Sequence, residues 1–190
     1  VRGLKKRDKY LKLFNLCSKL MLQIVEGRKP VIAKVHGAAF AAGCQLVASC
    51  DLAFSTKDAI FATPGVNIGL FCSTPMVAVS RKVNRKVMMK MLLTGEPIKA
   101  NYAKEIGLIN DCFPKNKLNQ EILKIAKKSA SKSNLTIKIG KRAFYKQLEM
   151  PLSKAYSFTS KMMTLNMMAR DAKEGISAFI EKRKPNWKNK

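Results

Sequence analysis

The groups best placed to do chemistry in this chain are backbone N–H groups among small residues. Residues 31–35 predict a short β-strand, and the small residues that follow give way to an apolar helical stretch. A helix that begins near Ala41 or Ala42 directly after a strand points free N–H groups outward, with its positive dipole end behind them. Small side chains let a ligand oxygen come close. The pattern is compatible with a site for an oxyanion or a carbonyl oxygen, but by itself it favours close packing of small residues before a buried helix.

Acidic side chains are missing from the same region. No Asp or Glu lies between Glu26 and Asp51, and none lies between Asp58 and Glu96. Acid–base enzymes need titratable groups in their pocket. This region therefore offers backbone hydrogen bonds and no carboxylate for proton transfer.

Nucleophilic and metal-ligating side chains are sparse. One histidine and five cysteines without a CxxC pair argue against zinc, and scattered thiols in apolar runs predict reduced core residues. We expect His36 to have a structural role in a turn, with contact to a ligand as the alternative. In the loop of Cys72, Ser73 and Thr74 no histidine is near in sequence, which argues against a nucleophile.

Strands and helices alternate in the first half of the chain. This alternation predicts a parallel or mixed sheet with crossover helices. The expected elements are a helix over 4–25, strands over 31–35, 51–55 and 59–62, a buried helix ending near residue 50, and helices ending at 79 and spanning 85–94.

The second half of the chain reads as almost wholly helical. We therefore predict two domains, 1–95 and 96–190, and a loose polar tail over 184–190. The expected helices cover 100–106, 117–131, 135–149, 152–169 and 172–180.

Composition indicates a folded but very basic protein. With 47% hydrophobic residues among 190, disorder as the main state is excluded. Lys and Arg total 37 against 12 Asp and Glu, a net charge of +25, yet there is one Trp and only 4 Tyr. Proteins that recognise nucleic-acid bases tend to use arginine side chains and clustered aromatic residues. The excess of lysine is therefore interpreted as a compositional bias of the surface, in preference to nucleic-acid binding. No apolar run approaches the ~20 residues of a membrane span.

Several sequence blocks occur in a recognisable order. Residues 29–71 read KPVIAKVHGAAFAAGCQLVASCDLAFSTKDAIFATPGVNIGLF, residues 92–110 read LLTGEPIKANYAKEIGLIN, and residues 174–187 read EGISAFIEKRKPNW. These blocks resemble the small-residue loop, the G-C-x-L helix, the later helix pair and the C-terminal helix of the enoyl-CoA hydratase/isomerase (crotonase) superfamily. The resemblance covers essentially the whole chain.

The resemblance implies an α/β fold, namely the C-terminal part of a crotonase-like spiral of ββα turns followed by a helical trimerisation region. It implies an acyl-CoA thioester as partner, coenzyme A as part of the substrate with no separate cofactor, and a homotrimer or hexamer. The compartment would be the cytoplasm in a bacterium or the mitochondrion in a eukaryote. Since the family's second oxyanion N–H comes from a loop upstream of Val1, the chain is expected to lack an N-terminal portion.

Site residues are carried over position by position. The backbone N–H of Ala42 matches one half of the family's oxyanion hole. For the two CoA-facing residues of the C-terminal helix, the alternative is a core Phe and a solvated Lys. The residues expected at the acyl pocket and the CoA nucleotide are Ala38, Ala39, Phe40, Ser73, Phe179 and Lys182.

The chain departs from the family where hydratases carry two catalytic glutamates. Gln45 and Gly65 stand at those positions. An amide cannot exchange a proton with water at neutral pH, and each acid–base group contributes roughly 10²- to 10⁴-fold. The sequence therefore predicts loss of ordinary hydration. It leaves open another reaction on an acyl-CoA, non-catalytic acyl-CoA binding, and nucleic-acid binding.

Overall fold

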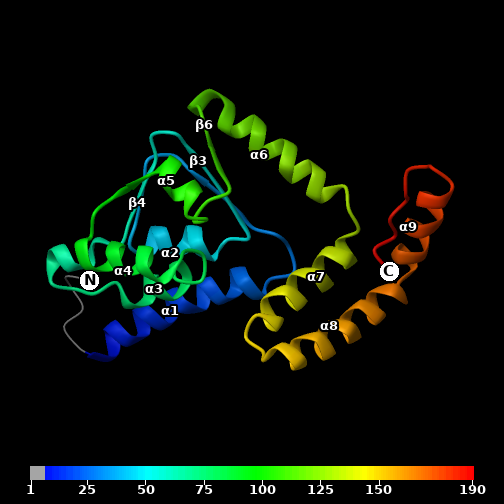
Figure 1. The fold of residues 1–190 in the computed structure, drawn as a ribbon, viewed down its shortest axis with the longest axis horizontal. Helices are drawn as coiled ribbons and strands as arrows, with labels where there is room; N and C mark the ends of the chain where they lie inside the picture. The colour runs from blue at the N-terminus through cyan, green and yellow to red at the C-terminus, as the bar shows by residue number, and fades with distance from the viewer. Residues whose placement is uncertain (1–6) are drawn as a thin grey trace. The chain divides into compact units, whose positions relative to one another are not determined.

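A computed structural model describes residues 7–190 (Figure 1). Residues 4–6 of the first expected helix lie outside the described residues. The described chain divides into two compact units, residues 7–25 with 31–122, and residues 26–30 with 123–190. The domain boundary expected after residue 95 stays a prediction.

Helices dominate both units. The helices are α1 (Arg7–Glu26), α2 (Ala42–Ser49), the 3₁₀ helix η1 (Pro64–Ile68), α3 (Ser73–Val79), α4 (Arg85–Thr94), α5 (Ala100–Glu105), α6 (Lys115–Ala130), α7 (Asn134–Gln147), α8 (Leu152–Met167) and α9 (Arg170–Ile180). The strands are β1 (Ile32–Val35), β2 (Ala38–Phe40), β3 (Leu52–Thr56), β4 (Ile60–Ala62), β5 (Ile98–Lys99) and β6 (Asp111–Phe113).

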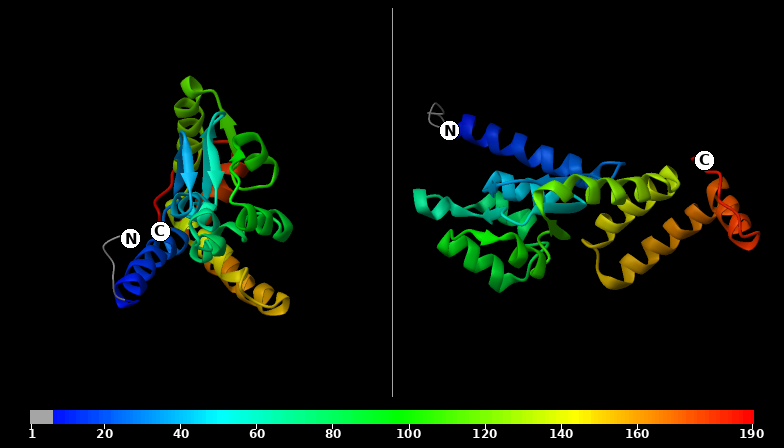
Figure 2. Two further views of the ribbon diagram at one scale, coloured as in Figure 1. Left: turned by 90° about the vertical axis from the view of Figure 1, so that its left-hand side faces the viewer. Right: turned by 90° about the horizontal axis from the view of Figure 1, so that it is seen from above.

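The first unit holds two small sheets in place of the single sheet expected. One is parallel, in the order β1-β3-β6, and its blue, cyan and green strands lie side by side in the left view of Figure 2. The other has the order β2-β4-β5, with β2 and β4 parallel and β4 and β5 antiparallel. Consecutive strands such as β3 and β4 are not paired with each other. The chain steps from one sheet to the other at each short turn, which is the ββα pattern.

The helix over residues 85–94 forms as predicted, and residues next to its ends determine where it begins and ends. The side-chain oxygen of Asn84 accepts a hydrogen bond from the N–H of Val87 at 2.9 Å, which caps the first turn. Gly95 follows the last helical residue with a φ of 64°, the left-handed conformation that ends helices. Both signals can be read from the sequence because they act within a few residues.

The core of the first unit lies around α2, which packs on α3. Cys44, Phe61 and Val79 are fully buried there. All five cysteines are free and four are buried, which confirms the prediction of reduced core thiols. The small residues of α2 let it lie close to its neighbours.

The tail of the second unit is docked, so the prediction of a loose tail was wrong. Asp171, 1% exposed, accepts hydrogen bonds from the N–H of Lys188 at 2.7 Å and from the hydroxyl of Ser133 at 2.5 Å. The indole N–H of Trp187 donates to the carbonyl of Ser131 at 2.8 Å. Its ring lies against Gly175, where an added Cβ would stand 3.2 Å from the indole. These contacts join residues distant in sequence, so no local pattern announced them.

Acid should release this tail. Burial raises the pKa of Asp171, but hydrogen bonds from Ser133 and from the N–H groups of Lys188, Asn189 and Lys190 outweigh it and lower the pKa below 3.8. A carboxyl with a lowered folded pKa stabilises the fold above its unfolded pKa, and that contribution is lost as the pH falls through the folded pKa. We therefore expect the tail to stay docked at neutral pH, to weaken once the pH falls below 3.8, and to detach as the pH falls through the lowered pKa of Asp171.

Fluorescence of the single Trp reports this docking. Asp171→Ala should shift the Trp187 emission to the red at neutral pH and lower the free energy of unfolding by about 2 kcal/mol, because the tail N–H groups lose their acceptor. Asp8→Ala, at an exposed position of α1, is the control. An unchanged emission spectrum in Asp171→Ala would show that the carboxylate does not hold the tail.

Candidate functional site

The turn between β2 and α2 brings strand, loop and helix terminus together. Phe40, the last residue of β2, pairs with Ala62 of β4. Ala41 follows with a φ of 47° and a ψ of −113°, and its N–H donates to the carbonyl of Ala62 at 3.0 Å. A positive φ in a non-glycine residue is strained, and such strain clusters at functional sites. The sharp turn aims the start of α2 away from the strand.

Ala42 is the first residue of α2. Because the first N–H groups of a helix have no helical carbonyl to bind, the Ala42 N–H is available to another acceptor. Ala41, the residue before it, provides no side-chain cap. Ala42 is exposed, so a ligand oxygen can approach. The structure thus places at Ala42 the helix terminus that the sequence predicted.

Gln45 lies one turn into α2, where its N–H bonds to the carbonyl of Ala41 at 3.0 Å. It is only 4% exposed, and among residues 7–190 its Oε1 finds no hydrogen-bond partner. The hydroxyl of Thr63, just after β4, is buried and likewise without a partner within that range. Buried polar side-chain atoms are nearly always paired, so each of these two groups is an exception within the buried part of the first unit.

Gly65 leaves no space for a side chain. An added Cβ would lie 2.6 Å from the carbonyl oxygen of Leu70 and 2.9 Å from the sulfur of Cys72. The Gly65 N–H donates to that sulfur at 3.3 Å, and its carbonyl accepts from the Leu70 N–H at 2.9 Å. The segment from 65 to 72 is folded back onto this glycine. A carboxylate at position 65 would require this segment to move.

The thiols near Gly65 are not activated. Burial raises the pKa of Cys44 to about 12, and the neighbouring Cys72 adds to the rise. Cys72 is buried at the start of α3 with its sulfur accepting from Gly65. A nucleophilic cysteine needs a thiolate and exposure. Because both thiols are buried, neither meets the need for exposure.

The remaining expected residues fall into two groups. On β2, Ala38 and Phe40 are exposed while Ala39 is buried, as the alternation of a strand requires, and Ser73 is exposed at the start of α3. Phe179 and Lys182 lie at the end of α9 in the second unit. Phe179 is 85% exposed, so the alternative of a core Phe was wrong.

Two features of the candidate site escaped sequence reasoning. The strained φ of Ala41 and the contact of Gly65 with Cys72 depend on tertiary packing. Outside this site, in the second unit, the carboxylates of Asp171 and Glu174 had a sequence signal, since they stand three residues apart on one helix in a chain poor in acids. The described chain, residues 7–190, shows no group of three or more His, Cys, Asp or Glu that could hold a metal ion.

Comparison with a family model assigns this chain to a protein family. Residues 4–190 match the family described as enoyl-CoA hydratase/isomerase. The chain belongs to this family. The resemblance in the sequence blocks is confirmed, and with it the crotonase-type α/β fold with a helical C-terminal region.

Curated relatives include human enoyl-CoA hydratase domain-containing protein 3, mitochondrial, with 52% identity over 181 residues. That match covers 95% of this chain and 60% of the relative. The probable mitochondrial enoyl-CoA hydratase of Dictyostelium discoideum is 34% identical over 165 residues, covering 86% of this chain and 59% of the relative. This enoyl-CoA hydratase/isomerase family chain thus spans about 60% of the length of such relatives.

Solved structures agree with the assignment. The crystal structure of an enoyl-CoA hydratase of Mycobacterium smegmatis matches with a TM-score of 0.97 at 48% identity, covering 98% of this chain and 73% of that one. Human enoyl-CoA hydratase domain-containing protein 3 matches with a TM-score of 0.94 at 51% identity, covering 96% and 72%. Within residues 7–190 of this family member, no helix is both long enough and apolar enough to cross a membrane.

Proposed function

We propose that this protein binds an acyl-CoA thioester and holds its carbonyl oxygen with the N–H of Ala42. The observation that carries the proposal is the start of α2, where the strained Ala41 presents an uncapped helix terminus at an exposed position. Such N–H groups, with the helix dipole behind them, suit an oxygen that carries partial negative charge. The family assignment supplies the substrate class.

Ordinary hydration is not part of the proposal. Hydratases of this family use two glutamates to activate water, and Gln45 and Gly65 stand at the matching positions here. The protein then acts on the acyl-CoA by another reaction or only binds it. Among these outcomes, a binding protein or an enzyme that relies on enolate stabilisation fits the absence of acids from this part of the sequence.

Phe179 and Lys182 are proposed to meet the CoA nucleotide, because CoA carries several phosphate charges and both side chains are exposed. A homotrimer or hexamer is part of the same proposal. Large apolar side chains of α8 are exposed in the single chain, among them Tyr156 and Met163, and such faces mark interfaces. Since the two curated relatives named above, from Homo sapiens and Dictyostelium discoideum, are mitochondrial proteins by name, we include that compartment.

A pair of ligands tests the role of Ala42 without a mutation. Butyryl-CoA should bind about fivefold more tightly than S-butyl-CoA, the thioether that lacks the carbonyl oxygen, because one hydrogen bond contributes about 1 kcal/mol. Isothermal titration calorimetry on the full-length protein measures both affinities. Equal affinities would contradict the proposed contact between the Ala42 N–H and the carbonyl oxygen. If neither ligand nor free CoA binds, the proposal of acyl-CoA binding itself is overturned.

A further inference from the structure

Helix α9 ends in a turn in which a lysine occupies a glycine position. The N–H of Arg183 donates to the carbonyl of Ala178 at 2.9 Å, and the N–H of Lys182 donates to that of Phe179 at 3.3 Å. These two bonds define a Schellman motif, whose penultimate residue is left-handed and is usually glycine. Here it is Lys182, with a φ of 54°.

A lysine is an unfavourable choice at this position. In the left-handed conformation a Cβ crowds the backbone, and glycine avoids that cost. Strained residues persist where the surroundings hold them in place, and they cluster at ligand sites. Lys182 therefore needs contacts that hold it in this turn, and its positive charge suits an anionic ligand.

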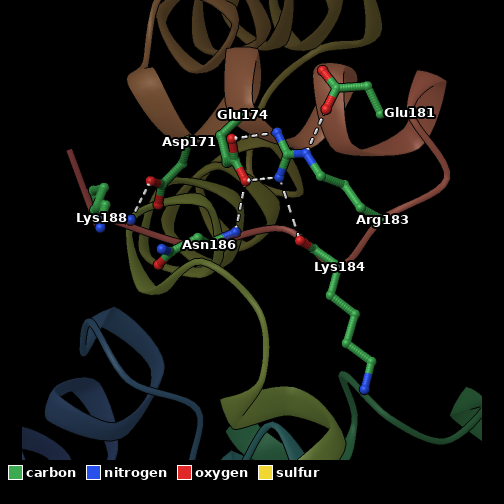
Figure 3. Close-up of polar contacts among 7 residues, drawn as sticks. All are labelled: Asp171, Glu174, Glu181, Arg183, Lys184, Asn186 and Lys188. Carbon is green, nitrogen blue, oxygen red and sulfur yellow. Dashed lines mark hydrogen bonds and ion pairs between the residues drawn. The ribbon is translucent and has the colours of Figure 1, made fainter.

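Ion pairs on both sides of Lys182 hold the turn. The Arg183 guanidinium binds Glu174 through both terminal nitrogens, at 2.6 and 3.0 Å, and its Nε binds Glu181 at 2.6 Å (Figure 3). Glu174 also accepts from the N–H of Asn186 at 2.7 Å. The residues that flank Lys182 are thus joined to each other and to the middle of α9. A two-pronged arginine–carboxylate pair fixes geometry as well as charge.

The pair stays ionised at any physiological pH. The hydrogen bond from Arg183, then that from the Asn186 N–H, lowers the pKa of Glu174 to about 2. The same pair raises the pKa of Arg183. Both groups are therefore charged at neutral pH, and Glu174 and Glu181 are already paired with Arg183, so the anion proposed for Lys182 comes from outside this network.

We propose that Glu174 and Arg183 are positioning residues that hold Lys182 in its left-handed turn, so that its ammonium group meets a phosphate of the coenzyme A nucleotide at a cost in stability. The identity of the anion rests on the proposed function; the strain of the lysine does not. If these ion pairs served only to close the helix and dock the tail, glycine at position 182 would do so better than lysine.

Lys182→Gly separates stability from binding. The variant should melt about 3 °C higher, because relief of the strain outweighs the added freedom of the unfolded chain. Its affinity for free CoA should fall about tenfold through loss of a charge-assisted contact. The control is Lys184→Gly, where the backbone φ is not positive and the melting temperature should not rise. A lower melting temperature in Lys182→Gly would overturn the proposal.

Coupling between two substitutions tests the positioning role of Glu174. Glu174→Gln should weaken CoA binding several-fold when Lys182 is present and should have no further effect in the Lys182→Gly background. A general structural role predicts the same loss in both backgrounds and would overturn the proposal. Glu105→Gln, at an exposed position of α5, controls for the loss of one negative charge.

Failure of the proposed function gives a different result. If the unmodified full-length protein does not bind CoA, the ligand assignment falls. The rise in melting temperature of Lys182→Gly would then support only the strain, and its absence would overturn that as well.

Discussion

The full-length protein should hydrate crotonyl-CoA at least about 10²-fold more slowly than an active hydratase of its family. Two groups that would hold and activate water are replaced, one by the amide of Gln45 and the other by Gly65. Each acid–base group contributes roughly 10²- to 10⁴-fold, and losses from groups that act together are not additive. The lower bound therefore uses the smallest contribution of a single acid–base group, about 10²-fold.

Loss of enoyl absorbance at saturating crotonyl-CoA measures this rate. An active hydratase, assayed in the same buffer, is the positive control, and calorimetric binding of butyryl-CoA shows that the preparation is folded and competent. Turnover within tenfold of the active hydratase would contradict the interpretation of Gln45 and Gly65. Gln45→Glu alone should not restore the rate, because a second carboxylate cannot enter at position 65 without moving the segment that covers it.

Gly65→Ala should lower the free energy of unfolding by about 3 kcal/mol, the upper part of the range for overpacked cores. The added methyl carbon would stand 2.6 Å from the carbonyl oxygen of Leu70 and 2.9 Å from the sulfur of Cys72. The first of these atoms belongs to the backbone, which relaxes less readily than a side-chain end. The segment from 65 to 72 must therefore shift, and the hydrogen bond from the Gly65 N–H to Cys72 is weakened.

Denaturant-induced unfolding measures this change, and another glycine supplies the control. Gly140 lies in α7 with nothing within 4 Å of an added Cβ, so Gly140→Ala should raise stability by up to about 1 kcal/mol. Equal stability of Gly65→Ala and the unmodified protein would show that the segment yields easily. In that case a glutamate could be accommodated at position 65, and the enclosure of Gly65 would not stand in the way of hydratase activity.

Elements with strong local signals were predictable. The helix over 85–94 begins at a capping asparagine and ends at a left-handed glycine, both visible in the sequence. The helix over 152–169 was also predicted, and the structure ends it two residues earlier at Met167. Local hydrogen bonds and helical spacing suffice for such elements because the relevant contacts lie within one or two turns.

Short strands and long-range contacts were not predictable. Strand β2 is three residues of small and aromatic character, and β5 has two residues, so neither carries a period-2 pattern. Their existence depends on pairing with β4, a partner distant in sequence. The docked tail escaped prediction for the same reason, since Asp171 meets Lys188 through the fold.

The sequence by itself determined the chemistry that is possible at the candidate site. Residue types alone remove the two carboxylates, leave a helix terminus among small residues, and supply the blocks that identify the family. Tertiary structure decided how much space and strain surround those residues: Gly65 is enclosed, Ala41 takes a positive φ, and Lys182 is held in a glycine conformation. The reason is physical. Side-chain chemistry is carried by each residue, whereas steric fit and backbone strain depend on neighbours that only the folded chain brings together.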